Sequence, residues 1–452
     1  MKIMAWIVSL FCLCASAEAA LFNPKVHTLS NGLTLIVIEN HRAPLVTHMM
    51  CLKVGTNKSP WGKSGMAHYL EHLMFKGKPG SVPERFMNDV SRLGGDSNAM
   101  TSSQYTFYHE TIPVSALETV MKLDAERLTQ LDIQDEWAVP EVKVILEERY
   151  MSVDNTVMGS FRETFDALAI RHHPSRLPII GWAHEIAAYT TQDALDFYNK
   201  WYAPNNTFVV IAGDITFEKA KELAEKCYGI IPAKTLPSRL DVKEPKSDGA
   251  TQDFTMTSEI SDAPFVVTRY SAPTLSDGDA QKFYALAVLE DLLGRSVTGR
   301  LTKALMETKH LASQIQIDYD GLKSGPGFFE ILMMPTPETS LTDLEKAVSA
   351  EIDQLMKNGV TQEEVQNAKD HMLSDLVYTQ DNVTKAAHNL AYLHACGLSI
   401  DQIEAWPDSV KSVTPAQVNA VVKQIFSNPQ HITGRLIPKQ ANTSETSHDS
   451  KK

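Results

Sequence analysis

The chain has 452 residues, of which 43% are hydrophobic, and its formal net charge is -13 at pH 7. This length and composition predict two or three packed domains rather than one. The acidic balance argues against nucleic-acid and anionic-membrane partners, because these need clustered lysine and arginine.

Residues 1–20 begin with one lysine, continue with an apolar run and end in small residues. This layout is typical of a secretory signal peptide, with cleavage after Ala17 or Ala19. The apolar run is too short to span a bilayer comfortably. A mitochondrial presequence is the competing interpretation, but the segment lacks arginine and carries Glu18. We therefore expect a periplasmic or secreted protein without a membrane span after cleavage.

Residues 21–231 combine strand and helix patterns. Alternating apolar residues around the turn sequences SNG and NHRAP predict two strands of an antiparallel sheet before Gly55. From Ser64, apolar residues at helical spacing predict a helix. The pattern then predicts strands after Gly94, a buried strand over 207–215, and helices over 115–133, 136–153 and 216–229. Three scattered cysteines predict buried thiols rather than a disulfide framework, namely Cys51, Cys227 and Cys396.

The rest of the chain predicts a second, similar unit. A polar, proline-rich stretch over 232–252 predicts a linker, and residues 438–452, with almost no apolar side chain, predict a disordered tail. Between them, residues 253–437 repeat the order of elements of 21–231, with Ala287 and Asp291 at the positions of His68 and His72. Two unrelated αβ domains are the alternative. We expect an α+β protein with two similar αβ domains, of which only the first keeps the histidines.

The stretch GMAHYLEHLMFKG holds two histidines four residues apart with a glutamate between them. On a helix, His68 and His72 face one point, and Glu71 lies over the same spot. Imidazole nitrogens bind Zn²⁺, and a carboxylate beside a metal-activated water can act as general base. A solvated polar helix face is the alternative. Apolar neighbours and the rarity of the H-x-x-E-H pattern favour the metal site.

A catalytic zinc needs a third protein ligand, and the helix predicted over 136–153 offers candidates. Glu141 and Glu148 are seven residues apart, so they share one helix face, while Glu147 points aside. One of the two could bind the metal and the other support it from behind. Taken alone, a solvated acidic stripe would be the more common explanation.

Six blocks of the sequence, in order, resemble the pitrilysin and insulysin family of metallopeptidases. They are SNGLTLIV, GKSGMAHYLEHLMFKG, GGDSNAMTSSQYTFYHE, PEVKVILEE, HPSRLPIIGW and YAPNNTFVVIAGDI. The resemblance covers nearly the whole chain after residue 20 and is strongest to the two-domain branch that includes mitochondrial processing peptidase and its bacterial relatives. It implies two similar αβ domains that face each other across a chamber, with one zinc ion on the wall of the first.

Residue by residue, the resemblance implies roles for five side chains. His68, His72 and Glu148 would hold the zinc. Glu71 would be the general base, and Glu141 would be the carboxylate that supports a ligand.

The resemblance also implies substrate-binding residues in both halves. The strand from Asn98 to Thr106 would pair with an extended peptide, with Asn98 and Ala99 close to the scissile bond, although the pattern alone indicates only a sheet strand. Relatives that work as one chain carry an arginine and, further on, a tyrosine in the second half. Arg300 matches the arginine, but Ser313 stands in place of the tyrosine. We therefore expect the protein to form a dimer, either with itself or with a zinc-less homologue that supplies the missing contact. The alternative explanation of Ser313 is a different substrate preference.

The sequence therefore predicts an exported zinc endopeptidase that acts on peptides or unfolded segments. A non-catalytic scaffold subunit of the same fold is the alternative, and metal storage would require more ligands in exposed tracts. The converging histidines and glutamates favour the enzyme, because a scaffold gains nothing from them.

Overall fold

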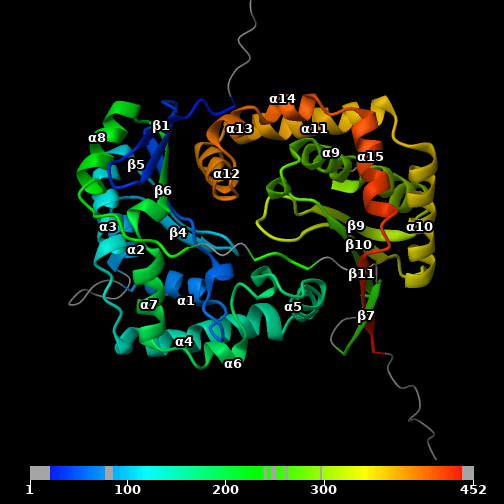
Figure 1. Ribbon diagram of the computed structural model, residues 1–452, viewed down its shortest axis with the longest axis horizontal. Helices are drawn as coiled ribbons and strands as arrows, with labels where there is room; N and C mark the ends of the chain where they lie inside the picture. The colour runs from blue at the N-terminus through cyan, green and yellow to red at the C-terminus, as the bar shows by residue number, and fades with distance from the viewer. Residues whose placement is uncertain are drawn as a thin grey trace, which may run out of the picture.

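The computed structural model describes residues 21–76, 85–238, 242–245, 251–259, 263–295 and 298–439 (Figure 1). The signal peptide expected over 1–20 lies outside these residues, as do parts of the expected linker. The tail expected from residue 438 lies outside them from residue 440 onward. Its first residue, Pro438, still belongs to a strand, so the ordered chain extends slightly further than the composition predicted.

Within the described residues, two sheets form the framework of the protein, one from each half (Figure 1). The first has the order β1-β2-β6-β3-β5-β4 and the second the order β7-β11-β8-β10-β9. Apart from β1 the two orders correspond, and each sheet has one parallel pair, β2 with β6 and β7 with β11. The shared topology identifies the halves as copies of one αβ unit, as the sequence repeat predicted. The strands are β1 Lys25–Thr28, β2 Thr34–Glu39, β3 Leu45–Leu52, β4 Asp96–Thr101, β5 Thr106–Pro113, β6 Thr207–Gly213, β7 Gln252–Ser258, β8 Phe265–Ala272, β9 Ala312–Tyr319, β10 Gly327–Pro335 and β11 His431–Pro438.

Helices cover these sheets. Those of the first half are α1 Met66–Leu73, α2 Arg85–Arg92, α3 Leu117–Thr129, α4 Asp135–Arg149, α5 Val157–Ala169, α6 Ala183–Ile186, α7 Thr191–Trp201 and α8 Phe217–Cys227. Those of the second half are α9 Ala280–Glu290, α10 Leu341–Asn358, α11 Gln362–Gln380, α12 Val383–Ala395, α13 Ile400–Glu404, α14 Trp406–Lys411 and α15 Pro415–Phe426. One face of the first sheet packs on α1, α3, α7 and α8, in a core that includes Met50, Leu70 and Phe197.

Each half also lends one helix to the sheet of the other half (Figure 1). Helix α12 packs on the first sheet, where Leu390 belongs to one apolar cluster with Met49 and Phe208. Helix α5 packs on the second sheet, where the rings of Phe161 and Phe265 lie 4.7 Å apart. Both faces of the central strands are therefore buried, which explains why their sequences are almost continuously apolar. The predicted domain boundaries, 21–231 and 253–437, assign α5 to the first domain and α12 to the second, although each helix packs on the sheet of the other half.

Two smaller expectations concern thiols and membrane spans. Cys51 and Cys227 are buried, Cys396 is partly buried, and all three are free thiols. No helix in the described part of the chain is both long and apolar enough to cross a membrane.

Candidate metal centre

The start of α1 is fastened to a distant segment of the first half. Gly65 has a φ of +80°, and a Cβ atom there would lie 2.3 Å from the carbonyl oxygen of Ile180, so only glycine fits. The backbone N–H of Ser64 donates to Glu185 at 2.6 Å, and the Ser64 hydroxyl accepts the N–H of Trp182 at 2.9 Å. These contacts set the position of α1, and with it the direction of its two histidines.

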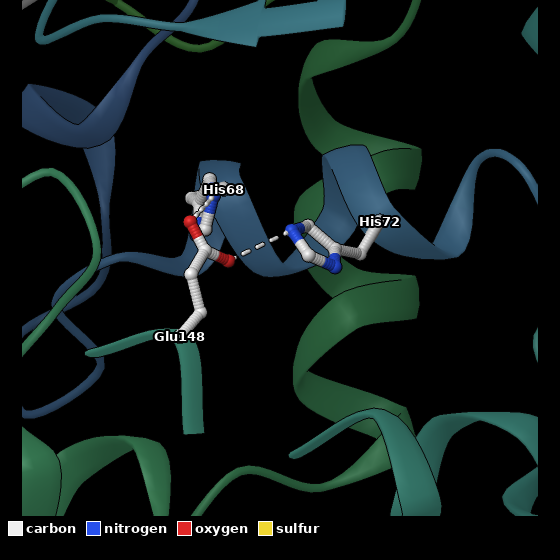
Figure 2. A group of neighbouring side chains, drawn as sticks. All are labelled: His68, His72 and Glu148. Atoms are coloured by element: carbon white, nitrogen blue, oxygen red, sulfur yellow. Dashed lines mark ion pairs between the residues drawn. The ribbon is translucent and has the colours of Figure 1, made fainter. Parts of the chain in front are cut away.

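His68 and His72 on α1 converge on Glu148, the penultimate residue of α4 (Figure 2). The Nε2 atom of His68 lies 3.6 Å from one carboxylate oxygen of Glu148, and Nε2 of His72 lies 3.3 Å from the other. All three ligand atoms lie within 4.8 Å of one another. Ligands in a tetrahedral zinc site are about 3.4 Å apart, given bonds of about 2.0–2.2 Å. The two nitrogen–oxygen distances are close to this value, so two imidazoles and one carboxylate fit a zinc ion.

A further carboxylate orients the His72 ring from the opposite side. Nδ1 of His72 lies 2.9 Å from Oε1 of Glu141, whose second oxygen accepts from Lys76 at 2.7 Å. Glu141 is buried, whereas Glu147 on the same helix is exposed. A metal-ligating histidine commonly uses one nitrogen for the metal and the other for such a partner. The structure therefore brings Glu141 and Glu148 to the histidines and leaves Glu147 outside.

The electrostatics of the two rings suit a cation site. Burial and the neighbouring His72 lower the pKa of His68 to about 4, so its ring is neutral, as a metal ligand must be. Burial lowers the pKa of His72, but hydrogen bonds with Glu141 and Glu148 outweigh this effect and raise the pKa to about 9. The surroundings of His72 thus stabilise positive charge between the rings and Glu148.

Glu71 lies on the same helix, with a side chain that is 9% exposed. Burial raises the pKa of its carboxyl, although a hydrogen bond from the Thr101 hydroxyl on β4 partly opposes this. A buried carboxylate with a raised pKa is suited to accept a proton. The hydrogen bond also fixes its direction relative to the histidines.

These side chains line a cavity of about 780 Å³ between the two halves. The first half contributes His68, Glu71, His72 and Glu148, the stretch from Ala99 to Tyr105 at the end of β4 and in the turn after it, Ser152 and Val153, residues of α5, and the segment from Ser175 to Ile180. The second half contributes Asp320, Leu322, Lys323, Tyr392 and Cys396. A cavity of this size accommodates a short extended peptide segment rather than a folded protein.

Two sequence profiles match consecutive parts of the chain. The profile described as Insulinase (Peptidase family M16) matches residues 34–181, and the one described as Peptidase M16 inactive domain matches residues 188–372. The chain belongs to the insulinase family, peptidase family M16. The register of the repeat, which sets Ala287 and Asp291 of the second half opposite His68 and His72, stays a prediction. Asp291 lies 2.6 Å from Nδ1 of His371.

Relatives that match nearly the whole M16 chain are named zinc proteases. PqqE of Helicobacter pylori is 28% identical over 440 residues, which cover 95% of this chain and 97% of PqqE. The crystal structure of a protease from Helicobacter pylori has a TM-score of 0.85 and 27% identity, over 92% of this chain and 99% of that one. The periplasmic protease PqqL from Escherichia coli shares the fold, with a TM-score of 0.76 and 17% identity over 92% of this chain and 47% of PqqL.

The expected substrate-pairing strand is shorter than its sequence suggested. The pattern from Asn98 to Thr106 predicts one strand, but β4 ends at Thr101 and β5 begins at Thr106. The chain turns between them because the Ser102 hydroxyl accepts the backbone N–H groups of the two residues before Thr106, each at 3.1 Å. β4 is the last strand in its sheet, so one edge of it is unpaired within the described sheet, and Ala99 lines the cavity.

The second-half residues singled out in the sequence lie elsewhere. Arg300 donates to both oxygens of Glu364, at 2.7 and 2.8 Å, and does not line the cavity. The Ser313 hydroxyl, on β9, donates to the carbonyls of Met334 and Pro335. A role of Arg300 in substrate binding stays a prediction.

Two contacts of the site were not predicted from the sequence. Lys76 lies three residues beyond the end of α1, so its contact with Glu141 depends on the turn that follows the helix. Thr101 follows Ala99 by two residues, so strand alternation could have placed both on one face. That Thr101 meets Glu71 depends on the packing of β4 against α1.

A second group of possible ligands has a different role. His48, Glu110 and Asp124 also lie within ligand distance of one another and are fully buried. Arg127 donates to Glu110 at 3.0 Å and also to Asp124. The positive charge that a metal would supply is therefore already present, and we interpret the group as a structural charge cluster.

Proposed function

We propose that this M16 chain is an exported zinc endopeptidase that hydrolyses peptides or unfolded segments. The observation that carries the proposal is the convergence of His68, His72 and Glu148 on one point, with Glu71 beside them on a cavity wall. Residues 21–231 would form the zinc-binding domain, and residues 253–437 the homologous domain without a metal site.

We assign each side chain of the site a role in peptide hydrolysis. His68, His72 and Glu148 would hold one zinc ion, which when bound polarises a carbonyl and lowers the pKa of water. Glu71 takes the proton of the attacking water and passes it to the departing amine. The hydrogen bond from Thr101 keeps Glu71 in place during both transfers.

The substrate would bind as an added strand. The outer edge of β4 would pair with the substrate backbone beside the site, and Asn98 and Ala99 would flank the scissile bond. The backbone N–H of Ala99 donates to the Asn98 side chain at 2.8 Å, so this bond would be exchanged for one to the substrate. Only a chain that can become extended fits this arrangement, which favours peptides and unfolded segments over folded proteins.

Export and partnership are further parts of the proposal. The layout of residues 1–20 supports export, and the description of Escherichia coli PqqL as periplasmic agrees with it. Arg300 and Ser313 do not line the cavity, which is compatible with a dimer in which a zinc-less homologue supplies further substrate contacts.

The test is turnover of a quenched fluorescent peptide library by the purified mature chain alone, with zinc measured on the same sample. Glu71→Gln should keep the zinc and lose turnover, whereas Glu148→Gln should lose the zinc. Zinc without turnover in the wild type would require the partner subunit. Absence of zinc in the wild type would contradict the proposal and favour a scaffold.

A further inference from the structure

Most charged side chains on the cavity wall, apart from the metal centre, are already paired. Each forms an ion pair that neutralises its charge, either with another wall residue or with a residue behind the wall. The pairs are Glu163 with Arg149, Asp166 with Arg269, Arg162 with Glu330 and Lys323 with Asp320. These residues therefore add little net charge to the cavity.

Arg176 differs from them. Its half-buried side chain lines the same cavity, and Nη1 donates to the backbone carbonyl of Arg171 at 3.1 Å. Among the described residues, no carboxylate forms an ion pair with Arg176. The guanidinium has five N–H donors, and the bond to Arg171 uses one of them, so it keeps donors for a ligand in the cavity.

Hydrogen bonds hold the loop that carries Arg176. The carboxylate of Glu244 accepts the backbone N–H groups of Arg171, His172 and His173 at 2.7 to 3.0 Å. Nδ1 of His173 then lies 2.8 Å from the Ser175 hydroxyl, directly before Arg176. Little backbone entropy would therefore be lost when Arg176 binds a ligand.

We propose that Arg176 is a specificity residue that binds a carboxylate of the substrate. A guanidinium prefers a planar anion that accepts two parallel hydrogen bonds, and a peptide offers one in an aspartate or glutamate side chain or at its C-terminus. The position of Arg176 on the cavity wall then sets the place at which the carboxylate is accepted. The inference rests on the proposed function and names its substrate class.

The test compares three kinds of fluorescent peptide with one core sequence. The first kind is neutral and has an amidated C-terminus, and the second is a series that adds one internal glutamate to it at successive positions. The third kind is neutral and has a free C-terminus. Turnover is measured on the wild type, and binding by anisotropy on the Glu71→Gln background. We expect the wild type to prefer a carboxylate-bearing peptide by about 10-fold. Arg176→Gln should remove that preference and leave the neutral peptide unchanged, whereas Arg176→Lys should retain part of it.

The control is Arg171→Gln, because Arg171 lies on the same loop but its exposed side chain does not line this cavity. If Arg176→Gln loses only the preference for the internal glutamate, the ligand is an acidic side chain. If Arg176→Gln loses only the preference for the free C-terminus, the ligand is the terminal carboxylate. Equal loss for all three peptides in Arg176→Gln, or an unchanged preference, overturns the inference while the proposed function stands. If the zinc-loaded wild type turns over none of the peptides, activity requires the partner subunit, and the binding preferences measured on the Glu71→Gln background decide the inference. Unchanged binding preferences in Arg176→Gln overturn the inference, whereas absence of zinc in the wild type overturns the proposed function.

Discussion

Nδ1 of His72 and Oε1 of Glu141 lie 2.9 Å apart, so the ring turns its Nε2 atom towards Glu148. Glu141 is itself held by Lys76, which makes the ring orientation a property of α1 and α4 together. The direction of one metal ligand therefore depends on a residue that does not bind the metal.

Glu141→Gln should weaken zinc binding by about 10- to 100-fold, because the amide is a poorer partner for the His72 N–H. The loss should be smaller than in Glu148→Gln, which removes a ligand. The measurement is zinc affinity by competition with a chelator. Glu147→Gln on the exposed side of α4 is the control and should leave the affinity unchanged. Equal affinities of Glu141→Gln and the wild type would contradict the assigned role.

Thr101→Val should lower kcat by about 10-fold with the zinc content unchanged, because Glu71 loses the hydrogen bond that orients it. Valine preserves the shape of threonine on β4. Thr101→Ser restores the hydroxyl and should recover most of the activity. Steady-state kinetics with zinc analysis test this. A serine variant as slow as the valine variant would show that packing, not the hydrogen bond, matters.

The buried charge cluster around His48 should make stability depend on pH. Burial lowers the pKa of His48, but Asp124 and Glu110, at 3.0 and 3.1 Å, raise it above the ordinary 6.5 to about 9. A raised folded-state pKa stabilises the protein fully below pH 6.5, and the contribution is lost as the pH rises through about 9.

His48→Gln should therefore lower the free energy of unfolding by about 3 kcal/mol at pH 6, and by clearly less at pH 9. Denaturant unfolding of both proteins at each pH measures the difference. His184→Gln is the control, because that side chain is 82% exposed. A difference that grows with pH would show that His48 is neutral in the folded protein.

The exchange of α5 and α12 should make the two halves unfold together. Leu390→Ala on α12 removes a fully buried side chain from the first sheet and should cost about 2–5 kcal/mol. Because α12 belongs to the second half, both halves should still melt in one transition at a lower temperature. Leu168→Ala, at a position 43% exposed, should have little effect. Two separate calorimetric transitions in Leu390→Ala would contradict this coupling.

The sequence by itself determined the features that are encoded within one element or by the order of elements. His68, Glu71 and His72 share a face because helical spacing is local, and Glu141 separates from Glu147 for the same reason. The order of elements gave the repeat, which the matching sheet topologies bear out.

Only the tertiary structure decided which distant elements meet. It placed Glu148 against the histidines, Thr101 against Glu71, and Arg176 on the cavity wall, and it exchanged α5 and α12 between the sheets. It also ended β4 at Thr101, through a turn that strand alternation does not reveal. The physical reason is that periodicity states which face of an element is buried, whereas the partner of that face depends on how all the elements pack around a shared core.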